Sequence, residues 1–230
     1  MAKIELSQGK LQAMRLLVNS ATQVIEEEGI NALTIRRVSE KAGYSSANIY
    51  KYFKDFSQLV AYASINSIKD LINDLYMHTD ESLNPIEMYM ISWYVFTTHT
   101  FKRPEVYKIL YMNFDGDLIN YFDEYYSIFP DEILDIPEEI RLTFFSSDSN
   151  LRTRHLLMLC AEKGYIDKKY IDDIYIFTNA AFYGFFNWVS VSQGYSVELV
   201  LDFMKRILLS YNPELKKILD DFKIYPRRQR

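Results

Sequence analysis

Apolar residues recur at helical spacing along most of the chain. Between residues 11 and 28 they lie three or four positions apart and form one stripe, made of Met14, Leu17, Val18, Ala21, Val24 and Ile25. Three glutamates and then Gly29 follow, which is typical of the end of a helix. No alternating pattern of useful length indicates a strand. The pattern therefore predicts an all-α protein.

Two short helices are predicted next. Thr34 is a good N-cap for a helix over residues 35–41, and Gly43 ends that helix. Ser45 is placed to cap a second helix over residues 46–52. Two short helices joined by a Gly-containing turn form a helix-turn-helix, whose second helix can enter the major groove of DNA.

Longer helices are predicted for the remainder of the chain. Asp55 or Ser57 begins a helix that runs through Leu75, and Pro and Gly residues then separate five long patterns. These patterns cover residues 85–101, 104–126, 138–163, 168–193 and 197–221. We expect about nine helices in two domains, namely a three-helix helix-turn-helix domain over 1–60 and a larger helical domain over 61–230.

Charge is distributed unevenly. The formal net charge of −5 at first argues against a nucleic-acid partner. However, residues 34–54 hold five basic residues and one acidic residue, which gives +4. The chain after residue 60, with 18 basic and 25 acidic residues, sums to −7. One electropositive segment on an acidic molecule indicates a local phosphate-binding face.

Several side chains of this segment suit contacts with DNA. Thr34 and Ser45 stand at helix N-termini, where free N–H groups and the positive end of the helix dipole favour a phosphate. Arg36 can donate two hydrogen bonds to guanine, and Asn48 can bind adenine in the same way. Hydroxyl groups and charge for backbone oxygens come from Tyr50, Tyr52 and Lys54.

The detailed string resembles the signature of the tetracycline-repressor (TetR) family over about residues 11–60. The resemblance is carried by Leu33-Thr-Ile-Arg-Arg-Val38, Ala42-Gly-Tyr-Ser45, Ile49-Tyr-Lys-Tyr-Phe-Lys54 and Leu59. It implies that Arg36, Ser46, Ala47 and Asn48 face bases, and that Thr34, Tyr50 and Tyr52 face phosphates. The expected DNA-binding set is Thr34, Arg36, Arg37, Tyr44, Ser45, Ser46, Ala47, Asn48, Tyr50, Lys51, Tyr52 and Lys54. For each of them the alternative is an ordinary solvated side chain.

Two positions depart from the family pattern. The third residue of the second helix is often acidic in the family, but here it is Arg37. A cation is poorly placed there against the helix dipole, so we expect an anionic partner such as phosphate. Phe56 stands where many members have a basic residue that touches phosphate, which puts that contact in doubt.

The stretch Ile174–Val197 contains no charged residue and is long enough to span a membrane. Its polar side chains would need partners in lipid, so we expect a buried helix at a protein–protein interface and no membrane contact. The first five residues contain no apolar signal region, which predicts a cytoplasmic protein.

A dimer is expected because helix-turn-helix proteins usually bind palindromes as two-fold dimers. The small residues Ala180 and Gly184 lie four positions apart and allow two helices to approach closely. The resemblance implies a four-helix interface formed by the last two long helices. The expected interface is Ala180, Ala181, Gly184, Trp188, Val191, Val197, Leu201, Met204 and Leu208. The alternative is a core within one chain.

The resemblance also implies a ligand pocket between the other helices, which are rich in aromatic residues. Apolar pockets with a few polar groups are the usual ligand sites. The candidate lining is Trp93, Tyr94, His99, Tyr107, Tyr111, Phe114, Arg152, His155, Phe182, Tyr183 and Phe186. For each aromatic residue the alternative is a place in the core of the domain, and for each polar residue it is the surface or a core position with a satisfied hydrogen bond.

We therefore expect a repressor that binds a palindromic operator in double-stranded DNA as a homodimer. By resemblance, a small apolar or aromatic inducer shifts the population away from the DNA-binding spacing of the two helix-turn-helix segments. An activator of the same fold, and a helical lipid- or partner-binding protein without DNA binding, are the alternatives. The sequence has no Gly-rich phosphate loop, no paired His at metal spacing and only one cysteine, so we expect no enzyme, cofactor or metal.

Overall fold

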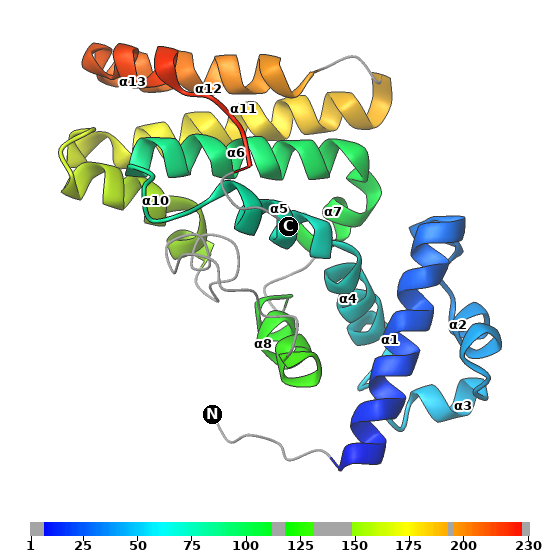
Figure 1. The fold of residues 1–230 in the computed structure, drawn as a ribbon. Coiled ribbons are helices and arrows are strands. Elements are labelled where there is room, and N and C mark those ends of the chain that lie inside the picture. The colour runs from blue at the N-terminus through cyan, green and yellow to red at the C-terminus, as the bar shows by residue number, and fades with distance from the viewer. Residues whose placement is uncertain (1–6, 112–117, 131–148, 193–195, 227–230) are drawn as a thin grey trace. The chain divides into compact units, whose positions relative to one another are not determined.

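The computed structural model describes residues 7–111, 118–130, 149–192 and 196–226 (Figure 1). Every regular element in these ranges is a helix, which confirms the all-α prediction. The chain divides into two compact units. Unit 1 contains residues 1–69 and 105–133, and unit 2 contains residues 70–104 and 134–230. The functional boundary at residue 60 stays a prediction.

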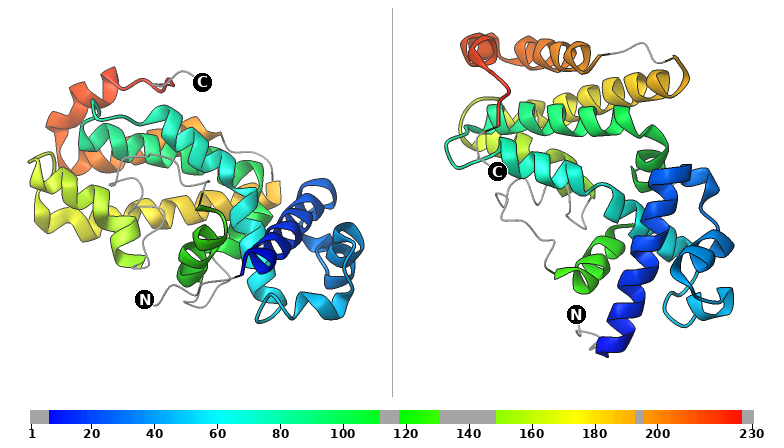
Figure 2. Two further views of the ribbon diagram at one scale, coloured as in Figure 1. Left: turned by 60° about the horizontal axis from the view of Figure 1, so that its bottom comes forward. Right: turned by 45° about the vertical axis from the view of Figure 1, so that its right-hand side comes forward.

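Unit 1 is built around the first helix. Its elements are α1 (Gln8–Glu28), η1 (Ile30–Ala32), α2 (Ile35–Ala42), α3 (Ser46–Ile49), α4 (Phe56–Ser67), most of α7 (Pro104–Tyr111) and α8 (Leu118–Ile128). Helix α1 packs against α2 and α4, as the two views of Figure 2 show, and α4 packs against α8. The apolar stripe predicted on α1 is buried, which confirms the period of that pattern.

The predicted fourth helix is two helices in the structure. Helix α4 ends at Ser67, and α5 (Lys69–His78) begins after Ile68. Near this break the Ser67 hydroxyl donates a hydrogen bond of 2.8 Å to the Ser64 carbonyl, a local bond that competes with the helical ladder. The start of α4 is confirmed at Asp55, whose carboxylate accepts a hydrogen bond of 2.8 Å from the Gln58 N–H.

A buried polar network joins α1, α4 and α8 within unit 1. The side-chain amide of Asn66 donates to the Asn19 carbonyl oxygen at 3.0 Å and to the Thr22 hydroxyl at 2.9 Å. The Tyr125 hydroxyl donates to the Asn66 carbonyl oxygen at 2.7 Å. Because these side chains come from three different helices, the network fixes the register of α1, α4 and α8.

Removing the Tyr125 hydroxyl is expected to destabilise the protein. Tyr125→Phe leaves the buried Asn66 acceptor without this donor, which costs about 1–3 kcal/mol. Urea unfolding followed by circular dichroism measures the change. Tyr44→Phe is the control, because no described residue accepts a hydrogen bond from the Tyr44 hydroxyl. Equal stability of the two variants would contradict the role given to this network.

Unit 2 is a layered helical bundle. Its elements are most of α5, α6 (Pro85–Lys102), α10 (Ser149–Glu162), η3 (Lys168–Tyr170), α11 (Ile171–Ser192), α12 (Val197–Tyr211), η4 (Pro213–Leu215) and α13 (Lys216–Asp221). Helix α6 packs against α10, α11, α12 and α13. Helices α11 and α12 lie side by side (Figure 1).

One other predicted helix is also shorter than expected, and two more are described only in part. The pattern over 104–126 corresponds to α7 and α8, with residues 112–117 outside the described ranges. The pattern over 197–221 is interrupted at Asn212, before Pro213. Proline has no N–H for the helical ladder, and the Asn212 side chain instead accepts a hydrogen bond from the Glu214 N–H at 3.0 Å. The part of the 138–163 pattern before residue 149 lies outside the described residues.

Candidate functional site

Two local features set the ends of α2, the first helix of the predicted helix-turn-helix. The Thr34 hydroxyl accepts a hydrogen bond of 3.2 Å from the Arg37 N–H, which confirms Thr34 as the N-cap. At the other end, Gly43 adopts φ +69°, in the left-handed region that glycine enters without strain. The following Tyr44 N–H then donates to the Ser39 carbonyl at 3.0 Å, so the chain turns sharply into α3.

A side-chain contact connects α2 with α3. The Ser39 hydroxyl lies 2.7 Å from the Ile35 carbonyl and 3.2 Å from the Ser46 hydroxyl. Val38 of α2 and Ile49 of α3 are fully buried beside it. These contacts hold the second short helix at a fixed angle to the first, as DNA recognition requires.

Helix α3 is shorter than the predicted helix over 46–52. It ends at Ile49, after which the Lys51 and Tyr52 N–H groups donate to carbonyls three residues earlier at 3.1 and 3.0 Å. The chain thus continues as tight turns of the 3-10 type. Ser45 is the N-cap, as predicted, but its hydroxyl makes no capping hydrogen bond.

The predicted DNA-binding residues are accessible. Tyr44, Asn48 and Tyr52 are half-buried, and the rings of Tyr44 and Tyr52 meet edge to face at 6.1 Å. The others are exposed, namely Thr34, Arg36, Arg37, Ser45, Ser46, Ala47, Tyr50, Lys51 and Lys54. This set combines hydroxyls, cations and an amide, which are the groups that bind phosphates and base edges. Their contact with DNA stays a prediction.

The charge balance of this face differs from the sequence-based expectation. Arg37 donates to Glu28, and Lys41 lies 2.6 Å from a carboxylate oxygen of Glu27. Glu27 and Glu28 end α1 and lie outside the segment 34–54, so the predicted +4 omitted them. The anionic partners of Arg37 in the structure are therefore carboxylates of this chain. Sequence analysis missed these acids, although three consecutive glutamates before Gly29 were the visible signal.

Loss of the Thr34 cap is expected to destabilise unit 1. Thr34→Ala removes the side-chain acceptor of the Arg37 N–H and should cost about 1 kcal/mol of stability. Thr34→Ser keeps the hydroxyl and should stay close to the original protein. Chemical denaturation of the three proteins measures the difference, and an unchanged Thr34→Ala variant would show that the cap contributes nothing.

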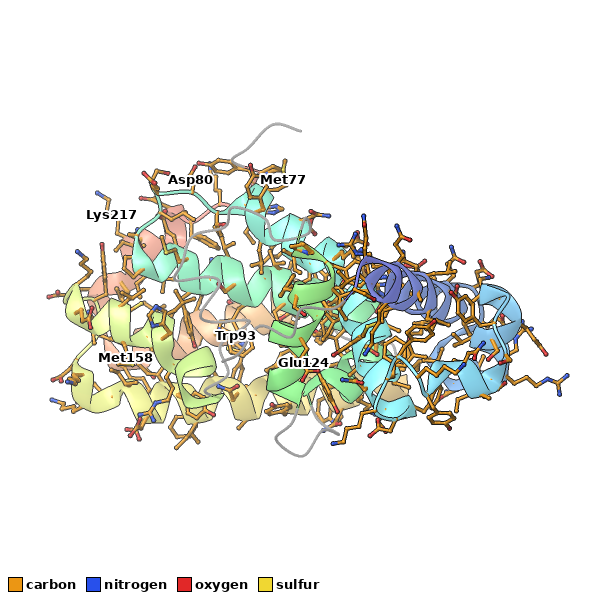
Figure 3. All side chains as sticks on the ribbon, turned by 90° about the horizontal axis from the view of Figure 1, so that it is seen from below. Met77, Asp80, Trp93, Glu124, Met158 and Lys217 are labelled. Atoms are coloured by element: carbon orange, nitrogen blue, oxygen red, sulfur yellow. The ribbon has the colours of Figure 1, made fainter. Side chains whose placement is uncertain are left out.

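Part of the predicted pocket lining gathers between α6 and α11 in unit 2. The ring centroids of Trp93 and Phe182 are 5.4 Å apart, and those of Phe182 and Phe186 are 5.8 Å apart. Phe96 joins them at 5.1 Å from Phe182. Figure 3 labels Trp93 on α6. Phe182 and Phe186 are buried, so these residues form an aromatic cluster within the helical bundle.

The other pocket candidates have different surroundings. His99 is buried, and its Nε2 lies 2.7 Å from a carboxylate oxygen of Asp74. Burial lowers the pKa of His99, and Asp74 opposes that shift. Tyr94 and His155 are half-buried, Tyr107 belongs to unit 1, and Tyr183 is exposed. Phe114 and the side chains of Tyr111 and Arg152 lie outside the described part of the chain.

Helix α11 carries an exposed apolar stripe on the side away from its buried residues. Ile176, Phe177 and Trp188 are 56%, 54% and 57% exposed. We define the outer stripe of α11 as Ile176, Phe177, Ala180, Tyr183, Gly184 and Trp188. A groove of about 330 Å³ lies between α11 and α12, lined by Phe177, Ala180 and Ala181 of α11 and by Phe203, Ile207, Ser210 and Tyr211 of α12. Large apolar patches of this kind mark interaction sites.

The predicted dimer face on α12 needs a correction. Leu201, Met204 and Leu208 are buried in the core of unit 2, whereas Leu199 and Phe203 are exposed. The same three- and four-residue spacing serves a core and an interface equally well, so the sequence pattern did not separate the two faces. Val197 is half-buried, and the side chain of Val191 lies outside the described residues. Sequence analysis also missed Ile176, Phe177 and Phe203, although the first two continue the stripe of Ala180 and Gly184.

The described residues bear on two expectations from the sequence, one about a membrane-spanning helix and one about a metal site. Within them, no helix combines the length and apolar character needed to cross a membrane. Nor do three or more His, Cys, Asp or Glu side chains gather there to hold a metal ion.

Comparisons with known proteins agree with the resemblance. Residues 17–63 match the family model described as bacterial regulatory proteins, tetR family. The structure is similar to RolR in complex with resorcinol, at 15% identity, covering 93% of this chain and 96% of that chain with a TM-score of 0.60. It is also similar to Thermus thermophilus FadR, a TetR-family repressor in complex with lauroyl-CoA, at 12% identity, 86% and 94% coverage and a TM-score of 0.53. No curated protein matched the sequence.

These matches identify the class of protein. The segment that contains α2, α3 and their turn lies within the residues that match the TetR-family model. The chain as a whole has the fold of TetR-family transcriptional regulators, with a larger helical domain after the helix-turn-helix.

Proposed function

We propose that the protein is a ligand-responsive transcriptional repressor that binds a palindromic operator in double-stranded DNA as a homodimer. The observation that carries the proposal is the exposed polar face of a complete helix-turn-helix, inside the residues that match the TetR-family model. Arg36 is exposed and Asn48 is half-buried, and their side chains suit guanine and adenine edges. Binding to DNA places the protein in the cytoplasm.

The homodimer is supported by the outer stripe of α11. A monomer would leave Phe177 and Trp188 in water, more than half exposed. A second copy, related by a two-fold axis, would cover these side chains with the same stripe of its own α11. Ala180 and Gly184, both exposed, would let the two helices approach closely. The dimer would then present two helix-turn-helix segments to two half-sites.

The effector is proposed to be a small apolar or aromatic molecule bound in unit 2. The aromatic cluster of Trp93, Phe96, Phe182 and Phe186 supports this, because aromatic side chains dominate sites for such molecules. RolR binds resorcinol, and Thermus thermophilus FadR binds lauroyl-CoA. Ligand binding would shift the population of dimers away from the DNA-binding state. We propose no catalytic step and no cofactor.

Selection of bound sites from random duplex DNA tests the proposal. The full chain is incubated with the library, with and without a small-molecule extract of cells. We expect an enriched palindrome and its loss when the extract contains the inducer. Enrichment that requires the extract would instead favour a ligand-dependent activator. Absence of enrichment in both arms would favour a helical lipid- or partner-binding protein.

A further inference from the structure

Two neighbouring arginines of α2 have different hydrogen-bond partners. Arg36 uses only its Nε, which donates to Glu40 at 2.8 Å, and its side chain is 86% exposed. Its two terminal nitrogens make no hydrogen bond with any described residue. Those nitrogens are the ones that a bidentate contact with guanine requires.

Arg37 uses all three of its guanidinium nitrogens. Its Nε and Nη2 donate to the two carboxylate oxygens of Glu28 at 3.1 and 2.5 Å, in the forked geometry of strong arginine–carboxylate pairs. Its Nη1 donates to Glu40 at 3.2 Å. Three of its five N–H donors are therefore occupied, and a phosphate would have to share this cation with two carboxylates of this chain. We call Glu28, Arg37, Glu40 and Arg36 the carboxylate network.

We propose that Glu28 is a positioning residue that withholds Arg37 from DNA phosphates. Glu40 in turn orients Arg36 toward the bases. Together these contacts lower the affinity for DNA of any sequence and raise the preference for the operator. This inference rests on the proposed DNA binding. It also changes the expected role of Arg37 from a phosphate contact to a cation neutralised within the protein.

Elementary electrostatics supports this role. Each phosphate contact by a cation releases counterions, so it adds affinity for every DNA sequence and steepens the dependence on salt. Neutralising one cation beside the bases removes affinity that carries no sequence information. Hydrogen bonds from Arg36 and Arg37 hold the pKa of Glu40 below its usual range, so its carboxylate remains charged near neutral pH.

Glu28→Gln tests the inference, with Glu26→Gln as the matched control. Both variants remove one negative charge from the last turn of α1, but Glu26 forms no ion pair with any described residue. Fluorescence anisotropy measures binding of each protein to a selected operator and to a shuffled duplex at several salt concentrations. We expect Glu28→Gln to bind the shuffled duplex severalfold more tightly, with a salt slope steeper by about 0.9 for each helix-turn-helix segment.

The other outcomes separate the inference from the proposed function. Adding Arg37→Ala to Glu28→Gln should abolish the gain, because the freed cation is then absent. Equal effects of Glu28→Gln and Glu26→Gln would reduce the network to a general charge effect and overturn the inference alone. Weaker binding of both duplexes by a folded Glu28→Gln protein would also overturn it. If no protein binds any duplex at low salt, the proposed function fails, and the inference fails with it.

Discussion

The double variant Arg36→Ala, Asn48→Ala is expected to lose most of its preference for the operator while keeping its fold. In the proposed DNA complex each residue exchanges a pair of hydrogen bonds with one base, and each lost pair should reduce affinity roughly tenfold to a hundredfold. Both side chains lie on the accessible face of the helix-turn-helix and neither is fully buried, so their removal leaves the core intact. The two losses together should reduce operator affinity by roughly a hundredfold or more.

A phosphate-contact variant provides the comparison for this loss. Lys54→Ala should weaken binding of operator and shuffled duplex about equally and reduce the salt slope by about 1. The double variant should instead weaken operator binding alone. Titration of both proteins against both duplexes measures the contrast. Unchanged operator binding by the double variant would remove Arg36 and Asn48 from the set of base contacts.

Ala180→Glu is expected to convert the dimer into monomers. Ala180 lies at the centre of the outer stripe of α11, one turn from Ile176 and one turn from Gly184. It is exposed in the single chain, so the glutamate is tolerated there. At a two-fold interface two such carboxylates would be buried close together, at an effective cost of several kcal/mol each. The dissociation constant of the dimer should therefore rise by roughly a hundredfold or more.

Sedimentation velocity at micromolar concentration measures this change. Met158→Glu is the matched control, because it places the same charge at another exposed apolar side chain of unit 2, on α10 (Figure 3). The control should remain a dimer and should still bind the operator. A monomeric original protein, or a dimeric Ala180→Glu protein, would contradict the proposed interface.

Features set by neighbouring residues were predictable from the sequence. Thr34, Gly43 and Asp55 act within one helical turn, so residue types were sufficient to place the ends of α2 and to narrow the start of α4 to Asp55 or Ser57. The break at Ile68 was not predictable, because it accompanies a serine hydroxyl that bonds to its own backbone inside an otherwise regular pattern. The helical spacing of apolar residues cannot predict such a hydrogen bond.

Features that depend on packing between helices were only partly predictable. The charge of the DNA-binding face depends on Glu28, which meets Arg37 because α1 packs on α2. A count over residues 34–54 could not include that contact. Likewise, the buried face of α12 and the exposed face of α11 share one spacing, and burial alone separates Met204 from Phe177. Trp93, Phe182 and Phe186 do pack together, but buried aromatic contacts of this kind suit a core and a pocket alike, so the ligand pocket stays a prediction.

Sequence-specific binding of double-stranded DNA is the central property of the proposed function. Fluorescence anisotropy of the full chain, titrated against the selected palindrome and a shuffled duplex of equal length over a range of salt concentrations, measures it. We expect the palindrome to bind roughly a thousandfold or more tightly than the shuffled duplex, with both affinities falling as salt rises. Equal affinity for the two duplexes, or no binding to either at low salt, would contradict it.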